Sequence, residues 1–230
     1  MTLPVLIILG ILLSLDSAIF ETLFLRQRSE GNHRISLFYK VLASAGFCGV
    51  GLLTALYAGK IQGCLIFGGL AMGLLGDFLL GMRKLSQKDH TVYFFLGMLV
   101  FSGGHIFYLT AVYRLCRLSS SAVFLVFLIL MLCAETFLYA HKIRQWKVHL
   151  AGLIYIAVEA LMAAASLVLA YCHTSLGSLL LATGAISFFA SDNLLCAYTF
   201  GDLKIPEVDQ AVHVTYLGAQ IFIAWSILFL

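Results

Sequence analysis

Two aspartates inside long apolar segments are the residues of this chain that could most readily do chemistry. Asp77 lies in the run Gly-Leu-Leu-Gly-Asp-Phe-Leu-Leu, which ends at Leu80, and Asp192 lies in Phe-Phe-Ala-Ser-Asp-Asn-Leu-Leu. An ionisable residue at membrane depth is costly and marks a functional site by default. Burial and mutual repulsion let two carboxyl groups hold one proton near neutral pH, so that one can act as acid and the other as base. A purely structural role, such as pairing with Lys40 or capping a neighbouring helix, is the alternative for either aspartate alone.

Further polar side chains occur at a similar level of the apolar segments. We assign five of them to substrate binding or orientation: Lys40, His105, Tyr108, Tyr216 and Gln220. The rings and the amide can orient water or an ether oxygen, and a lysine can bind a phosphate. For His105 an interhelical hydrogen bond is an equal alternative. Asp16 and Glu159 also lie at membrane depth, but the sequence shows no partner for them at a matching level, so we leave them outside the candidate site.

The composition of the 230-residue chain determines which elements must hold these residues. Hydrophobic residues make up 62% of it and charged residues 11%, whereas about a quarter of the residues of soluble proteins are charged. Long apolar runs without two-residue alternation predict membrane-spanning helices, not a barrel. We therefore predict an all-α membrane protein, one transmembrane domain over residues 1–230, with about eight helices: 3–25, 35–57, 61–80, 91–113, 119–139, 148–170, 175–198 and 210–230.

The basic residues predict how these helices are oriented. Eleven of the fourteen Lys and Arg residues lie in or beside the first, third, fifth and seventh loops, and three, Lys60, Arg114 and Arg117, lie on the other side. Loops rich in Lys and Arg stay in the cytoplasm. The pattern places both termini outside the cytoplasm, in a multi-pass protein of a bacterial inner or plasma membrane or a eukaryotic endomembrane. The net charge of +3 is thus a topology signal and indicates no nucleic-acid partner.

The cysteines and histidines show no spacing typical of a metal site. The six cysteines occur singly, without a CxxC pair, and the seven histidines form no HxxxH or HExxH pattern. Small buried apolar roles are the simplest interpretation of the cysteines. We expect no disulfide framework, no protein-bound metal and no other cofactor.

The two aspartates are 115 residues apart, which is half the chain. The same interval relates three other pairs: Gly69 with Gly184, Phe101 with Tyr216, and His105 with Gln220. A leucine pair follows each aspartate after one residue. A parallel four-plus-four duplication would explain these matches. Chance similarity between apolar segments is the alternative.

Four motifs, in order from about Lys40 to Gln220, are similar to those of a known family. They are Gly76-Asp77-x-Leu79-Leu80, Phe101-x3-His105-x2-Tyr108, Gly184-Ala185-x-Ser187-Phe188-x2-Ser191-Asp192-x-Leu194-Leu195, and Thr215-Tyr216-Leu217-x-Ala219-Gln220. With these motifs the chain resembles the YhhN-like lysoplasmalogenase family of integral membrane hydrolases. It departs from the family pattern at Val41, where a proline often follows the lysine.

The resemblance implies hydrolysis of the vinyl ether bond of lysoplasmalogens, the sn-1 alkenyl lysophospholipids. The products would be a fatty aldehyde and glycerophosphoethanolamine or glycerophosphocholine. Asp77 and Asp192 would correspond to the family's catalytic pair. Vinyl ether hydrolysis needs a protonated acid and a second carboxylate that stabilises the cation or activates water, a division of labour also found in glycoside hydrolysis. The implied partners are the lysophospholipid, water and membrane lipid.

A proton-coupled transporter or channel is the competing prediction, because paired carboxyl groups inside a membrane also relay protons. Transporters usually contain helices that are interrupted within the membrane. The only prolines of this chain, Pro4 and Pro206, lie outside the apolar core of the predicted helices. This favours the hydrolase. A purely structural protein would not need carboxyl groups at this depth.

Overall fold

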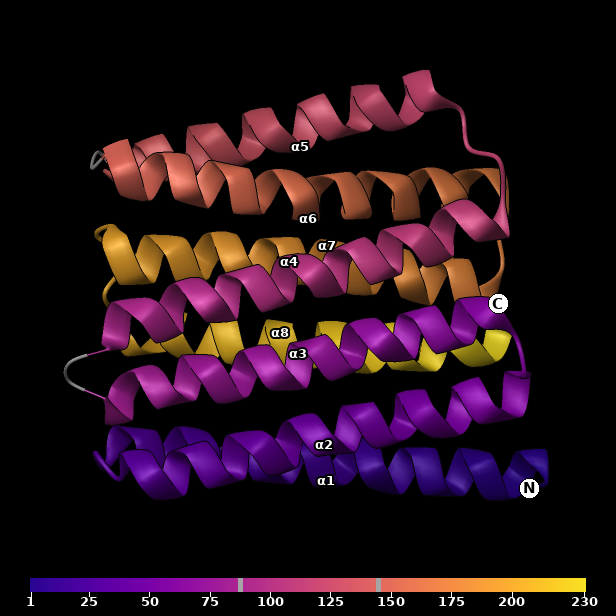
Figure 1. Cartoon of the computed structure of the whole chain (residues 1–230), viewed down its shortest axis with the longest axis horizontal. Coiled ribbons are helices and arrows are strands. Elements are labelled where there is room, and N and C mark those ends of the chain that lie inside the picture. Colours follow the sequence, from indigo (N-terminus) through magenta and orange to yellow (C-terminus); the bar gives the residue numbers. More distant parts are fainter. Residues whose placement is uncertain (87–88, 144–145) are drawn as a thin grey trace. The chain divides into compact units, whose positions relative to one another are not determined.

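The computed structural model describes residues 1–86, 89–143 and 146–230, and over these ranges every regular element is an α-helix (Figure 1). Each of the eight helices is long and apolar enough to cross a membrane. The prediction of an all-α protein with about eight spanning helices is therefore confirmed. The helices are α1 (Leu3–Ser29), α2 (His33–Ala58), α3 (Ile61–Leu85), α4 (His90–Leu115), α5 (Ser120–Ala140), α6 (Trp146–Cys172), α7 (Leu176–Phe200) and α8 (Pro206–Phe229).

Most helices extend past their predicted apolar segments, and α3 does so by more than one turn. It ends at Leu85 instead of residue 80, with Arg83 and Lys84 in its last turn. Basic side chains are favourable there, because they lie next to the negative end of the helix dipole. As a consequence Asp77 lies eight residues before the helix end, farther from it than the predicted end at residue 80 implied. The two prolines lie in the first turns of α1 and α8, where a missing N–H breaks no helical hydrogen bond.

The chain divides into two compact units, Met1–Ala111 and Val112–Leu230. In the first unit α1 packs on α2 and α2 on α3, and α3 packs on α4 through glycines. In the second unit α5 packs on α6, α6 on α7, and α7 on α8, with a smaller contact between α5 and α7. Consecutive helices are thus neighbours in both units. Whether the two units act as one domain stays a prediction.

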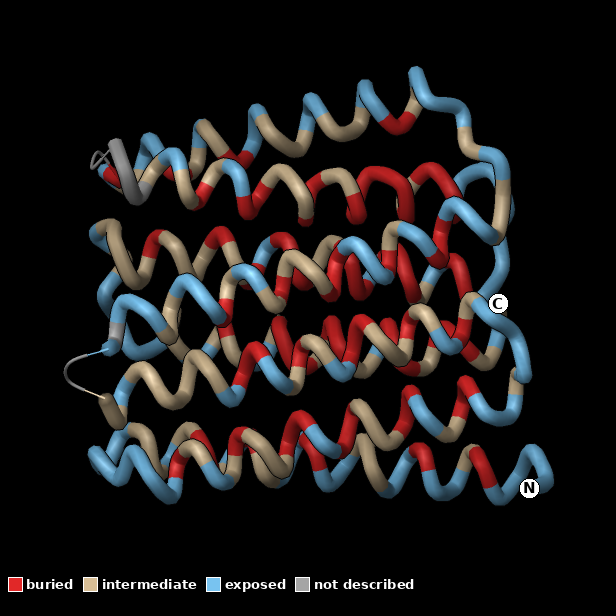
Figure 2. The backbone as a smooth tube through the Cα atoms, viewed as in Figure 1, coloured by how far each residue is buried: buried red, intermediate tan, exposed pale blue. Residues whose placement is uncertain are grey.

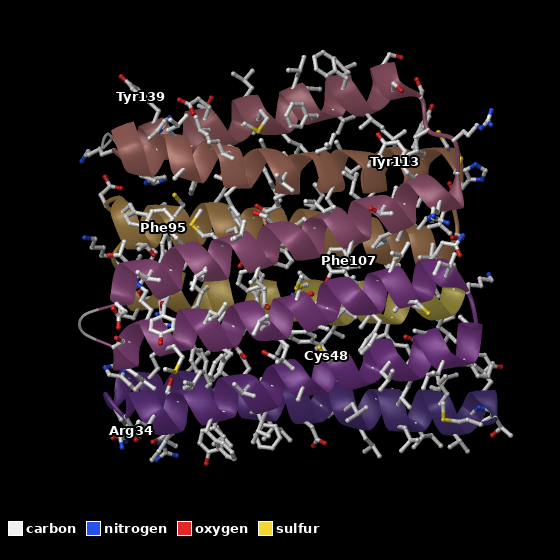
Figure 3. All side chains as sticks on the ribbon, viewed as in Figure 1. Arg34, Cys48, Phe95, Phe107, Tyr113 and Tyr139 are labelled. Atoms are coloured by element: carbon white, nitrogen blue, oxygen red, sulfur yellow. The ribbon has the colours of Figure 1, made fainter. Side chains whose placement is uncertain are left out.

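Much of α1 and α5 is exposed, whereas α6 is largely buried (Figure 2). Ile8 and Leu12 of α1 and Leu132 of α5 are exposed. So are the aromatic side chains of Phe95 and Tyr139 (Figure 3). Apolar surface of this extent suits contact with lipid and would be unfavourable in water. It supports an integral membrane protein.

Close approaches between helices recur in the two units with one common register. Two contacts of α3 with α4 have counterparts between α7 and α8, with both partners shifted by 115 residues: Gly69–Tyr108 with Gly184–Ile223, and Gly69–Gly104 with Gly184–Ala219. At each of these places a glycine lets a neighbouring helix come close, as expected for small residues in membrane helices. The aspartates also match, since Asp192 lies eight residues before the end of α7. These contacts support the four-plus-four repeat.

The orientation of the helices across a membrane stays a prediction. Two of the basic residues on which it rests, Lys88 and Arg144, lie outside the described residues. Lys40 is buried inside α2, so it is no part of a loop. The six cysteines are free thiols, in keeping with the expectation of no disulfide framework.

Candidate active site

The first unit contains a buried polar cluster built from three consecutive helices. Glu21 comes from α1, Lys40 and Ser44 from α2, and Asp77 from α3, and all four are buried. The Lys40 Nζ atom lies 2.9 and 3.1 Å from the two carboxylate oxygens of Glu21. It also lies 3.8 Å from the Asp77 Oδ1 atom. Asp77 thus shares the ammonium with a glutamate that the sequence analysis did not single out.

Lys40 is surrounded by protein groups that can offset its charge. Besides the two carboxyl groups, the ring of Phe24 lies below the ammonium, with Nζ 5.3 Å from the ring centroid. Buried charges persist in proteins when they are paired, and an aromatic face adds a further favourable contact. The structure therefore gives Lys40 a role as counter-ion of Glu21 and Asp77. The phosphate contact predicted for it stays a prediction.

Ser44 gives Asp77 a hydrogen-bond partner whose direction depends on protonation. Its Oγ atom lies 2.6 Å from Asp77 Oδ2 and 2.9 Å from the carbonyl oxygen of Lys40. A hydroxyl has one proton to donate. Ser44 therefore donates to an ionised Asp77, or it donates to the carbonyl while a protonated Asp77 donates to Ser44. In either state the Asp77 oxygen keeps a partner, which suits a group that exchanges a proton.

His105 and Tyr108 lie on α4 and are both buried. Their rings meet edge to face, with centroids 6.1 Å apart. Tyr108 packs against Gly69 of α3, and Phe101, two turns earlier on α4, packs against Gly76, the residue before Asp77. The structure thus places this part of α4 along the stretch of α3 that leads to Asp77. The orienting roles of His105 and Tyr108 are not tested by these contacts.

In the second unit Asp192 lies on α7 and accepts a hydrogen bond from the hydroxyl group of Tyr155 on α6. Glu159, one turn after Tyr155, is completely buried. One of its carboxylate oxygens lies within 4.8 Å of a carboxylate oxygen of Asp192. Neither oxygen of Glu159 has a hydrogen-bond partner among the described residues. A second carboxyl group therefore belongs beside Asp192, although the sequence analysis had left Glu159 out.

Tyr216 and Gln220 of α8 form a buried pair in the same unit. The Gln220 Nε2 atom donates a hydrogen bond of 3.1 Å to the Tyr216 hydroxyl oxygen. The Tyr216 ring lies edge-on to Phe188 of α7, with centroids 5.2 Å apart. Phe188 is one turn before Asp192, so the pair packs against the part of α7 that carries the aspartate. Their roles in orienting water or substrate stay predictions.

The helix before each aspartate contacts it through two residues that are four positions apart. Corresponding residues of the two units differ by 115 in number: Lys40 with Tyr155, Ser44 with Glu159, and Asp77 with Asp192. Side chains four positions apart lie on the same face of a helix. One face of α2 is therefore directed at Asp77, and the corresponding face of α6 is directed at Asp192. The interval of 115 residues, applied to Lys40, is the sequence signal that could have found Tyr155. The same interval leads from Ser44 to Glu159. Ser44 is recognised as a site residue only from its contact with Asp77, which the structure reveals.

Two further acidic residues of the helices, Asp16 and Glu135, are not among the contacts of these clusters. Asp16 is exposed on α1. Glu135 of α5 pairs with His149 of α6, with 3.1 Å between carboxylate oxygen and Nε2.

Comparison with known protein families identifies the family of this chain. The model of the YhhN family matches residues 35–227. The chain belongs to the YhhN family. No curated protein and no solved structure shows a significant match. The matched range begins in α2 and ends in α8, and of the clustered residues only Glu21 precedes it.

The two clusters of this YhhN protein are suited to proton transfer. Each has a carboxyl group with a hydroxyl-bearing partner, Ser44 for Asp77 and Tyr155 for Asp192. Carboxyl groups in such surroundings can act as general acids or bases. Glu159 and Asp192 are also close enough to bind a cation together. Chemistry without a metal therefore stays a prediction.

Proposed function

We propose that this protein is a membrane-embedded hydrolase of lysoplasmalogens. It would cleave the vinyl ether bond at the sn-1 position and release a fatty aldehyde and glycerophosphoethanolamine or glycerophosphocholine. The observation that carries the proposal is the membership of the YhhN family over a range that contains both aspartates. The buried carboxyl groups with hydroxyl partners support it.

The reaction requires one acid and one group that accepts a proton or stabilises a cation. The acid gives a proton to the β-carbon of the alkenyl group, and the electrons of the carbon–carbon double bond form the new C–H bond. Water then adds to the oxocarbenium ion and loses a proton. The resulting hemiacetal breaks its C–O bond to give the aldehyde and the glycerol hydroxyl. In the proposal Asp77 and Asp192 supply the acid and the base. Water or the ether oxygen is oriented by His105, Tyr108, Tyr216 and Gln220.

A lipid substrate fits a protein made of spanning helices. The alkenyl chain can enter from the bilayer, against the exposed apolar side chains of the helices. Basic residues in the last turns of α1 and α3 stand where a headgroup phosphate could bind: Arg26, Arg28, Arg83 and Lys84. In the proposal Lys40 assists indirectly, by holding Asp77.

The test offers purified protein three lysophospholipids with the same headgroup and chain length, carrying a vinyl ether, an alkyl ether or an ester at sn-1. Aldehyde and fatty acid are measured separately. We expect aldehyde from the alkenyl lipid alone. Fatty acid from the ester substrate, without aldehyde from the vinyl ether, would contradict the proposal.

A proton-coupled transporter or channel is the second candidate, and the buried carboxyl groups favour it. The eight described helices are continuous across their apolar lengths, whereas transporter sites are usually formed by interrupted helices. Proteoliposomes with an internal pH dye distinguish the two functions. Substrate-dependent proton flux without aldehyde release would favour the transporter.

A further inference from the structure

Helix α1 is mostly exposed, yet it buries a carboxyl group. Its five buried residues are Leu6, Gly10, Ser17, Glu21 and Phe24. Burying a carboxylate is unfavourable unless a charge or hydrogen bonds compensate it. Replacing a buried ion pair by apolar side chains is often neutral or stabilising. A glutamate at position 21 therefore has no advantage for the packing of α1 alone.

Contacts on both sides of Glu21 direct the buried face of α1 at α2. Ser17, one turn earlier, donates a hydrogen bond of 2.9 Å to the carbonyl oxygen of Ala43. Phe24, three residues later, has its ring centroid 5.3 Å from the Lys40 Nζ atom. Residues at these spacings share one face of a helix. Glu21 is thereby held opposite Lys40, with its two carboxylate oxygens 2.9 and 3.1 Å from Nζ.

Glu21 is closer to the ammonium of Lys40 than Asp77 is. The Nζ atom lies 2.9 Å from Glu21 and 3.8 Å from the Asp77 Oδ1 atom. A lysine side chain has a long flexible stem, so the carboxyl groups that attract its ammonium determine where the ammonium lies. An ammonium favours an ionised carboxyl group more strongly at hydrogen-bond distance than farther away. Glu21 therefore limits how strongly Lys40 favours the ionised form of Asp77.

We propose that Glu21 is a positioning residue for Asp77, because it holds the Lys40 ammonium at a distance from which Asp77 can still bind and release a proton. Glu21 and Lys40 exchange no proton with the substrate. This inference deepens the proposed function and rests on it, since Asp77 is a catalytic group in that reaction. The family match begins at residue 35, so the role of Glu21 is inferred from the contacts of this chain.

Other titratable groups approach Asp77 from α2 and α4. On α2, Cys48 interacts electrostatically with Asp77. On α4, His105 and Tyr108 belong to the stretch that packs along α3. A substitution of Glu21 leaves all three groups in place. A change in the titration of Asp77 is then caused by the charge at position 21.

Carbon-13 NMR of the full chain with labelled aspartate carboxyl groups tests the inference without substrate. The Asp77 signal is the one that is absent from Asp77→Asn. In Glu21→Gln this signal should titrate about one pH unit or more below its wild-type position, because a negative charge beside the shared ammonium is removed. Glu135→Gln is the matched control. It removes a carboxyl group that pairs with His149 in the second unit and should leave the Asp77 signal unchanged.

Two NMR results would overturn the inference. One is an Asp77 signal that titrates at the wild-type pH in folded Glu21→Gln. The other is a wild-type Asp77 signal that does not titrate at any pH at which the protein stays folded, because Asp77 would then exchange no proton.

Kinetics show whether the reaction uses this arrangement. Glu21→Gln should move the limb of the kcat pH profile that matches the Asp77 titration to lower pH, with KM nearly unchanged. Glu21→Asp keeps the charge on a side chain that is shorter by one carbon, and its profile should lie between those of Glu21→Gln and the wild type. A purely structural role would reduce the folded fraction and leave the profile of the folded protein in place.

The double variant Glu21→Gln with Lys40→Met serves if Glu21→Gln alone does not fold, because it removes both charges of the pair. It should keep most of the wild-type stability and still lower kcat roughly tenfold or more, the factor that accompanies one pH unit. Wild-type stability together with wild-type kcat would show that the pair is only structural. Wild-type protein that releases no aldehyde would refute the proposed function, while the NMR titration would still decide on the placement of the ammonium.

Discussion

The substitution Lys40→Met separates two roles for the buried ammonium of the first unit. Methionine keeps the apolar stem and removes the charge that lies 2.9 Å from Glu21 and 3.8 Å from Asp77. Removing one partner of a buried ion pair costs about 3–5 kcal/mol, whereas an exposed pair contributes about 0–1 kcal/mol. The side chains of Lys40 and Glu21 are only 6% and 3% exposed. The buried figure therefore applies, and we expect a loss of about 3–5 kcal/mol in the free energy of unfolding.

Thermal unfolding of the purified variants measures this loss. For a chain of this size it corresponds to a fall in Tm on the order of 10 °C. Lys204→Met, at an exposed position between α7 and α8, is the matched control and should leave Tm nearly unchanged. The double variant Glu21→Gln with Lys40→Met should recover most of the stability, because it also neutralises the carboxylate left behind.

The counter-ion role and the phosphate-binding role of Lys40 predict changes in different measured quantities. A counter-ion affects stability and, through Asp77, kcat. A phosphate ligand affects mainly KM for the lysophospholipid. Unchanged Tm with a raised KM in Lys40→Met would refute the counter-ion role. It would also show that Glu21 does not depend on the ammonium.

Four other outcomes test the site and the topology. Asp77→Asn and Asp192→Asn should each lower turnover roughly 10²-fold or more, with folding retained because a neutral amide is cheaper to bury than a charge; near-normal aldehyde release from either folded variant would refute the acid–base role. The double variant should be scarcely worse than the worse single one, since residues that act as one unit are not additive. Activity should survive a chelator, and a loss reversed by zinc would show that a metal is required. Reporter fusions should place both termini outside the cytoplasm, and a cytoplasmic C-terminus would reverse the predicted orientation.

The helices of this protein could be predicted from the sequence because the length of an apolar run is itself a physical requirement of the bilayer. The ends were less predictable. The α3 helix continues through Gly81 to Leu85 and includes two basic residues, which an apolar count excludes. In a membrane helix such long side chains extend toward the interface while their backbone stays helical.

The contacts between polar residues were harder to predict, for a related reason. A helix that is apolar on all sides carries no pattern to show which face meets its neighbour. Glu21 and Lys40 therefore gave no sign of their ion pair, although both were visible as polar residues in apolar runs. Asp77 and Asp192 could be singled out because an aspartate at this depth is unusual whatever it faces. Glu159 could be recognised as a partner only after the face of α6 was known.

The same arrangement of helices surrounds the aspartates of the two units with different side chains. In each unit, two residues that are four positions apart on one helix lie next to an aspartate on the following helix. The helices are α2 and α3 in the first unit, and α6 and α7 in the second. The first unit places an ammonium at the earlier position, so its carboxyl groups gain a counter-ion inside the protein. The second unit has a phenol there, which donates a hydrogen bond but cannot offset a charge, and a carboxyl group at the later position. Asp77 in the first unit is thus held by an ammonium, whereas Asp192 in the second unit accepts a hydrogen bond from a phenol and lies near a second carboxyl group.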